Sequence, residues 1–217
     1  MLPPPPAPTF AATGPLPFAP RGPLGEAVLR HLTGSPGDEP HDRLAHRAVA
    51  RSGRIAEDDD IQLALFALYA SAYGSVAGFR PEAEWDPRLI ETRRILEEAF
   101  ERELRAAIPV PELPEPQAGA VARALFALTG ADSGPSVPRH LAKRATLEQA
   151  REFLIQRSVY TLREADPHSW AIPRLVGRPK AALVEIQADE YGGGRPDRVH
   201  AEIFAKAMRG AGLDDAY

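Results

Sequence analysis

Apolar residues recur every three or four positions through much of this chain, between breaks made by proline and glycine. The clearest run lies within residues 57–77 and consists of Ile61, Leu65, Leu68, Tyr69, Tyr73 and Val76. This spacing follows the 3.6-residue period of an α-helix. No segment shows the apolar–polar alternation of a half-buried strand, and there is no Asn-Gly hairpin turn. The sequence therefore predicts an all-α protein.

Several further helices are expected between the breaks. They cover residues 24–32, 44–50, 87–108, 117–129, 147–165, 179–190 and 196–208. Thr146 and Gln149 have the spacing of a capping box, which predicts a helix start, and Pro167 predicts that this helix ends at 165. The acidic run Asp58–Asp60 is expected to start a helix with its side chains in solvent, favoured by the helix dipole.

Composition divides the chain into three parts. Nine of the 23 prolines lie in residues 1–23, which predicts a proline-rich disordered tail, with a ligand for a proline-recognising domain as the alternative. Residues 24–145 form an N-terminal helical region. Residues 146–217 carry the residues of greatest chemical interest.

The composition also excludes several kinds of site. There is no cysteine, so disulfides, thiolate metal sites and cysteine nucleophiles are ruled out. The net charge is −4 and the basic residues are dispersed, which argues against a nucleic-acid partner. No apolar run approaches the ~18 residues of a membrane helix, and the start does not resemble a secretory signal, so a cytoplasmic protein is expected. His31, His41 and His46 are interpreted as ordinary surface or boundary histidines.

Residues 181–208 combine a carboxylate and an imidazole across a glycine turn. Glu190 follows Ile186 by one helical turn and should face the core, whereas Asp189 is turned roughly 100° away. After the glycines at 192–194, a helix restarting at Pro196 would place His200 on its buried stripe. Such a pair is compatible with metal ligation. The alternative is a core histidine and a glutamate whose hydrogen-bonding partners are each other or an arginine.

Glu164 lies in the last turn of the helix predicted over 147–165. A carboxylate is disfavoured at a helix C-terminus, so a positive group, either an arginine or a metal, is expected nearby.

The run EADPHSWAIPRLVGRPKAALVEIQADEYGGGRPDRVHAEIFAKAM resembles the iron-containing redox enzyme family of the haem-oxygenase-like diiron oxidases. The resemblance covers about residues 146–217 and implies a haem-oxygenase-like helical bundle, in which two irons activate O2. By position, Glu164 matches the first glutamate ligand of the family. Glu190 matches an extra carboxylate before the glycine turn, and His200 matches the first histidine, so all three are expected to be metal ligands.

The chain departs from the family pattern after His200. The later core helices, with a further carboxylate and an Asp-x-x-His set, are not found in the sequence. The expected explanations are a longer protein, a C-terminal partner segment or homodimer that completes the site, or a relic. The three donors alone would support one weak divalent site rather than two irons.

The predicted function is iron- and O2-dependent oxidation of a small organic substrate, which this chain would support only in part. The main alternative is a non-catalytic helical binding or scaffold protein, in which Glu190 and His200 satisfy each other. Haem handling is a second alternative, which the Glu…Glu…His pattern disfavours.

Overall fold

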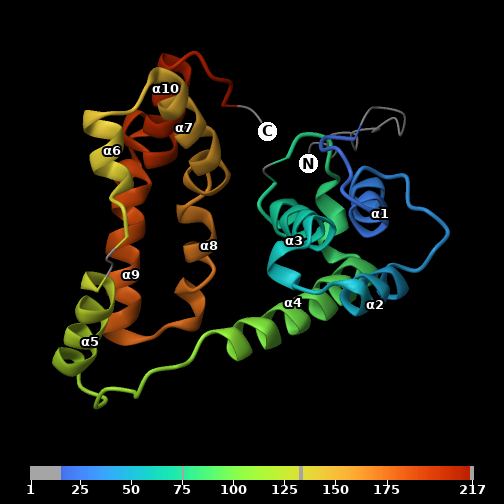
Figure 1. The fold of residues 1–217 in the computed structure, drawn as a ribbon, viewed down its shortest axis with the longest axis horizontal. Helices are drawn as coiled ribbons and strands as arrows, with labels where there is room; N and C mark the ends of the chain where they lie inside the picture. Colours follow the sequence, from blue (N-terminus) through green and yellow to red (C-terminus); the bar gives the residue numbers. More distant parts are fainter. Residues whose placement is uncertain (1–15, 75, 132–133, 216–217) are drawn as a thin grey trace, which may run out of the picture. The chain divides into compact units, whose positions relative to one another are not determined.

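The computed structural model describes residues 16–74, 76–131 and 134–215, and within these ranges every regular element is a helix (Figure 1). The predicted all-α class is confirmed. The chain divides into two compact units, unit 1 up to Glu115 and unit 2 from Pro116 to Ala216. The boundary predicted after residue 145 stays a prediction. By their contacts, residues 116–145 group with the C-terminal helices. In the described ranges no helix is long and apolar enough to cross a membrane.

Unit 1 contains α1 (Pro23–Leu32), α2 (His41–Arg51), α3 (Asp59–Ala72) and α4 (Pro87–Ala107), with 3-10 turns at Ile55–Glu57 and Pro81–Trp85. Helix α1 packs on α3, and α2 packs on α4. The apolar stripes of these helices form the core, whose fully buried side chains include Leu24, Val28, Leu29, Leu32, Ile61 and Leu96.

The predicted proline-rich tail lies largely outside the described residues. Residues 1–15 belong to that part. Leu16 and Phe18, which fall within the predicted tail, are partly buried against the core of unit 1.

The acidic start of α3 caps two helices. Asp58 accepts hydrogen bonds from the backbone N–H groups of Asp60 and Ile61, as expected of an N-cap. The expectation that all three acids face solvent is wrong for Asp60, which is buried. Its carboxylate accepts the Leu24 N–H at 3.1 Å and the Gly25 N–H at 2.6 Å. Asp60 thus satisfies N–H groups at the start of α1, which have no acceptor within their own helix.

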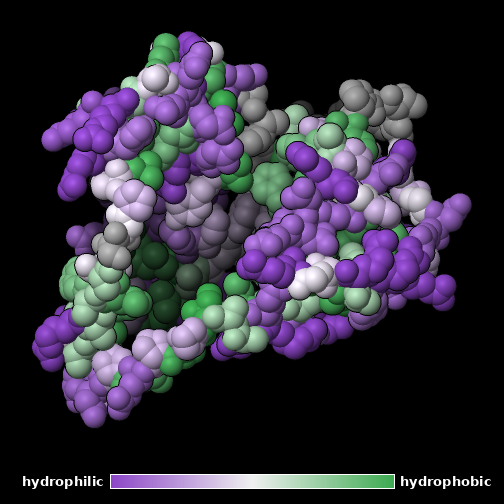
Figure 2. Space-filling view, in the orientation of Figure 1, coloured by the Kyte–Doolittle hydropathy of each residue, from purple (hydrophilic) through white to green (hydrophobic). Residues whose placement is uncertain are grey.

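Unit 2 contains α5 (Ala118–Gly130), α6 (Val137–Lys143), α7 (Leu147–Thr161), α8 (Ala165–Ser169), α9 (Gly177–Glu190) and α10 (His200–Gly210). The predicted capping box at Thr146 and Gln149 is confirmed. Helix α10 packs on α7, and α8 lies beside α9. Few apolar side chains of this unit are buried, and α5 buries none, so its hydrophobic residues lie at the surface (Figure 2).

Several predicted helices have different bounds in the structure, and two of these differences affect the candidate site. The helix predicted to reach 165 ends at Thr161, and α8 then begins at Ala165. Pro167 is the third residue of α8, where a backbone N–H would have no intrahelical acceptor. The helix predicted from Pro196 begins at His200, because Pro196–Arg198 forms a 3-10 turn and Val199 is extended.

Candidate metal-binding site

Glu164, Glu190 and His200 line the same cavity, which has a volume of about 210 Å³. Glu164 lies between α7 and α8, Glu190 is the last residue of α9, and His200 is the first residue of α10. The cavity therefore lies where the ends of four helices meet. The sequence predicted these three residues as a set, and the fold brings them to one place.

Glu190 and His200 form an ion pair. The Nδ1 atom of His200 lies 2.9 Å from Oε2 of Glu190. Glu190 is 20% exposed and its neighbour Asp189 is exposed, as predicted. However, Ile186, on which the helix-face prediction rested, is itself exposed, and Gln187 is the buried residue of α9. The prediction that His200 faces the core is wrong, since its side chain is 47% exposed. The cause is the later start of α10, which buries Ala205 and Met208 instead.

The glycine turn makes this pair possible. Gly192, Gly193 and Gly194 all have positive φ, a region that is costly for residues with a Cβ atom. At Gly192 the backbone also approaches the next segment. An added Cβ would lie 2.6 Å from the carbonyl carbon of Arg198 and 2.7 Å from the nitrogen of Val199. Only glycine lets the end of α9 come this close to the start of α10.

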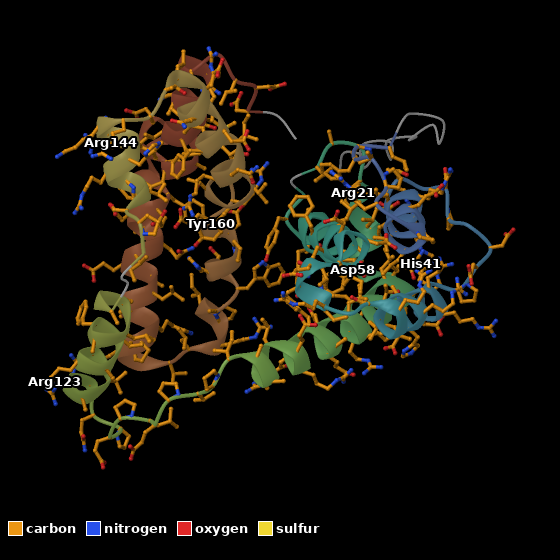
Figure 3. All side chains as sticks on the ribbon, in the orientation of Figure 1. Arg21, His41, Asp58, Arg123, Arg144 and Tyr160 are labelled. Carbon is orange, nitrogen blue, oxygen red and sulfur yellow. The ribbon has the colours of Figure 1, made fainter. Side chains whose placement is uncertain are left out.

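Tyr160 connects to Glu164 one helical turn further on. Burial raises the pKa of Tyr160, and the negative charges of Glu164 and Glu190 raise it further. The Arg157 guanidinium lies 5.3 Å from the centroid of the Tyr160 ring, and its positive charge lowers this pKa. Tyr160, labelled in Figure 3, thus interacts electrostatically with two of the predicted ligands.

A hydrogen-bond network fixes α8 against α9. Gln187, the buried residue of α9, donates to the Ala165 carbonyl at 2.7 Å and to the Ser169 hydroxyl at 2.8 Å. The Tyr191 hydroxyl donates to Asp166 at 2.9 Å. These bonds place the start of α8, and so Glu164, beside the end of α9.

Sequence reasoning missed two residues of this cavity, Asp166 and Tyr191, which line it together with the predicted donors. The available signal was their position, since each lies within two residues of a predicted ligand.

The donor types suit iron, because carboxylate oxygens and imidazole nitrogens make up mixed N/O iron sites. As they stand, however, no three His, Asp or Glu residues within the described part of the chain form a metal-holding group. Glu190 is paired with His200, and Glu164 interacts electrostatically with Tyr160. The pair engages Nδ1 of His200, so Nε2 is the ring nitrogen suited to a metal, with Glu190 orienting the ring as carboxylates do behind metal-bound histidines.

Non-haem metal sites in helical proteins are built from carboxylates and imidazoles on neighbouring helices, which are the side chains that line this cavity. Residues 151–217 match the family model described as iron-containing redox enzyme. The family predicted from the sequence is thereby confirmed for this segment, which contains Glu164, Glu190 and His200. No curated protein and no solved structure matches the chain.

Proposed function

We propose that unit 2 binds iron through Glu164, Glu190 and His200 and serves in the O2-dependent oxidation of a small organic substrate. The observation that carries this proposal is the coincidence of two independent facts. The family match falls on this segment, and the three residues line one cavity although 36 positions separate the first from the last. Ferrous iron held by such donors would keep coordination positions open for O2.

The pairing of His200 with Glu190 suggests how the roles are divided. His200 would offer Nε2 to iron, and Glu164 would supply an anionic oxygen. Glu190 would either bind through the oxygen that is not paired with His200 or keep the imidazole oriented. Tyr160 would hold the Glu164 carboxylate in place. A second iron would require donors beyond these three, supplied by a partner segment or by a second copy of the chain.

Space for a substrate lies on the other side of His200. A wide hollow of about 830 Å³ is lined by α9, the glycine turn and α10, and it includes Ile186, Ile203 and His200 itself. Apolar side chains with a few polar groups at one edge are typical of small-molecule sites. A substrate bound there would be next to the same imidazole that faces the cavity of Glu164.

The alternative function is that of a non-catalytic helical protein. The observation that favours it is the Glu190–His200 ion pair itself, because the two side chains already satisfy each other. In that case the pair would join α9 to α10, and the unit would act by binding a partner.

Iron uptake separates the two functions. The purified chain is reconstituted with Fe(II) without oxygen, and bound metal and the optical change on admitting oxygen are measured. We expect iron to bind, and Glu164→Ala, Glu190→Ala and His200→Ala each to reduce the bound amount. Asp189→Asn is the matched control, because Asp189 is the exposed neighbour of Glu190. The oxidase function is refuted if the chain takes up no iron, or if the three variants retain as much iron as the control.

A further inference from the structure

Unit 1 contains a buried pair of histidines that the proposed iron chemistry does not use. His31 on α1 is 0% exposed and His41 on α2 is 3% exposed. Nδ1 of His31 lies 3.3 Å from Nε2 of His41, and Nε2 of His31 lies 2.8 Å from Oδ2 of Asp86. Asp86 is the N-cap of α4. The chain Asp86–His31–His41 therefore joins three helices of this unit (His41 is labelled in Figure 3).

The neighbours of the two rings determine where the hydrogens lie. Asp86 is a carboxylate and can only accept, because hydrogen bonds from Arg88 hold its pKa well below the usual range. Nε2 of His31 must therefore carry a hydrogen, and its Nδ1 is an acceptor in the neutral ring. Nε2 of His41 lies 3.3 Å from the Ala27 carbonyl oxygen, which also only accepts. His41 therefore carries its hydrogen on Nε2, which faces both Nδ1 of His31 and the Ala27 oxygen, and in this arrangement both rings are neutral.

This arrangement leaves one hydrogen between the two rings. A proton added to Nδ1 of His31 would point at the N–H of His41, and two donors cannot form a hydrogen bond. His41 would have to move its own hydrogen to Nδ1 to keep the contact. If both rings were protonated, each facing nitrogen would carry a hydrogen, and the hydrogen bond between the two rings would be lost. Between α1 and α2, the bond from Nε2 of His41 to the Ala27 carbonyl would remain.

The surrounding charges do not compensate for two added protons. Asp86 is the acid beside His31, but it already accepts from the backbone N–H, Nε and Nη2 of Arg88. The Arg88 guanidinium lies 3.3 Å from Nε2 of His31 and repels a positive ring. Asp42 favours a charged His41 from within α2, but burial of the ring outweighs it.

We propose that the His31–His41 pair is an acid-sensitive clasp, which stabilises the packing of α1, α2 and the start of α4 when its rings are neutral and weakens this packing when both rings take up a proton.

The direction of the pH effect follows from burial. Burial lowers the pKa of His31 and of His41 below the value in an unfolded chain. The unfolded chain therefore binds more protons than the folded one in the pH range just below about 6.5. Above that pH the clasp contributes fully to the free energy of unfolding. This contribution is lost as the pH falls toward the lowered pKa values of the two histidines.

The test uses the full chain in a Trp170→Phe background, so that Trp85, next to Asp86, reports unfolding of unit 1 in urea. Wild type is compared with His41→Gln, whose amide N–H can still donate to His31 but does not titrate. His46→Gln is the control, because His46 is exposed on the same helix. We expect the logarithm of the unfolding constant to rise on acidification by up to about two units per pH unit from the two rings. This rise in the logarithm of the unfolding constant should be halved in His41→Gln and unchanged in His46→Gln.

Nitrogen NMR of the histidine rings gives a second measurement that needs no variant. We expect both rings to be neutral Nε2–H tautomers at pH 7.5 and to take up protons only below the model-peptide value of about 6.5. Equal pH dependence in wild type and His41→Gln would overturn the proposal. So would rings that are charged at pH 7.5 or that titrate at or above the model value, and this result decides the matter if His41→Gln does not fold.

Discussion

Replacing Gly192 by alanine tests whether the glycine turn creates the Glu190–His200 pair. Two costs arise at this position. The residue has a φ of 66°, and a non-glycine residue in this region costs about 1–2 kcal/mol. In addition, the new Cβ would lie 2.6 and 2.7 Å from backbone atoms of Arg198 and Val199, which cannot rotate away as a flexible side chain can.

Relieving this overlap requires the start of α10 to move away from the end of α9. Overpacking of this kind costs about 1–3 kcal/mol. We therefore expect Gly192→Ala to destabilise unit 2 by about 2–5 kcal/mol in total. Gly193→Ala is a close control, because Gly193 has a φ of 60° but nothing within 4 Å of an added Cβ. It should cost about 1–2 kcal/mol, from the backbone conformation alone.

The assay is urea unfolding followed by Trp170 fluorescence in a Trp85→Phe background, together with Fe(II) affinity for each variant that folds. Loss of an orienting carboxylate behind a metal-bound histidine typically reduces metal affinity about 10–100-fold. We expect that loss in Gly192→Ala and a smaller one in Gly193→Ala. Equal effects of the two substitutions, on stability and on affinity, would show that the close approach has no role and refute the reasoning.

Two further substitutions each test the interactions of one side chain. Asp60→Ala should destabilise unit 1 by about 2 kcal/mol, the upper end for an N-cap, because two buried N–H groups of α1 lose their acceptor. Asp59→Ala, at an exposed position, should change the urea midpoint far less, and comparable shifts would contradict the assignment. Tyr160→Phe should weaken Fe(II) binding by freeing Glu164, while Tyr69→Phe in the other unit should leave metal titrations unchanged. An iron affinity unaffected by Tyr160→Phe would show that the tyrosine does not position the ligand.

The fold class could be predicted from the sequence because helical periodicity is a local pattern. Periodicity identified most of the helices but not α6 and α8, and the metal-ligand role of Glu164, Glu190 and His200, taken from spacing and family resemblance, stays a prediction. The start of α10 could not be predicted reliably, because Pro196 is equally compatible with a helix and with the 3-10 turn that forms. This difference of a few residues moves His200 from the buried stripe to the exposed N-terminus of the helix.

The tertiary hydrogen bonds were beyond local reasoning. Asp60 caps a helix that begins 37 positions before it, at Pro23, and His31 meets His41 only because α1 and α2 fold back on each other. The interpretation of His31 and His41 as surface or boundary histidines was therefore wrong, since both are buried. Such contacts depend on how helices pack, which residue spacing along one helix does not contain.

The distribution of buried side chains predicts that the two units differ in stability. Among the described residues, the large side chains with less than 2% exposure all lie in unit 1. Each buried aliphatic side chain contributes about 1.5–3 kcal/mol, so amide hydrogens of α1 and α3 should exchange more slowly than those of α5 and α9 when exchange is followed by mass spectrometry. Fe(II) stabilises the state that binds it, and it should therefore slow exchange in α8–α10 while leaving α1 and α3 unchanged. Uniform protection without metal would contradict the first expectation, and slowing spread over both units would contradict an iron site confined to unit 2.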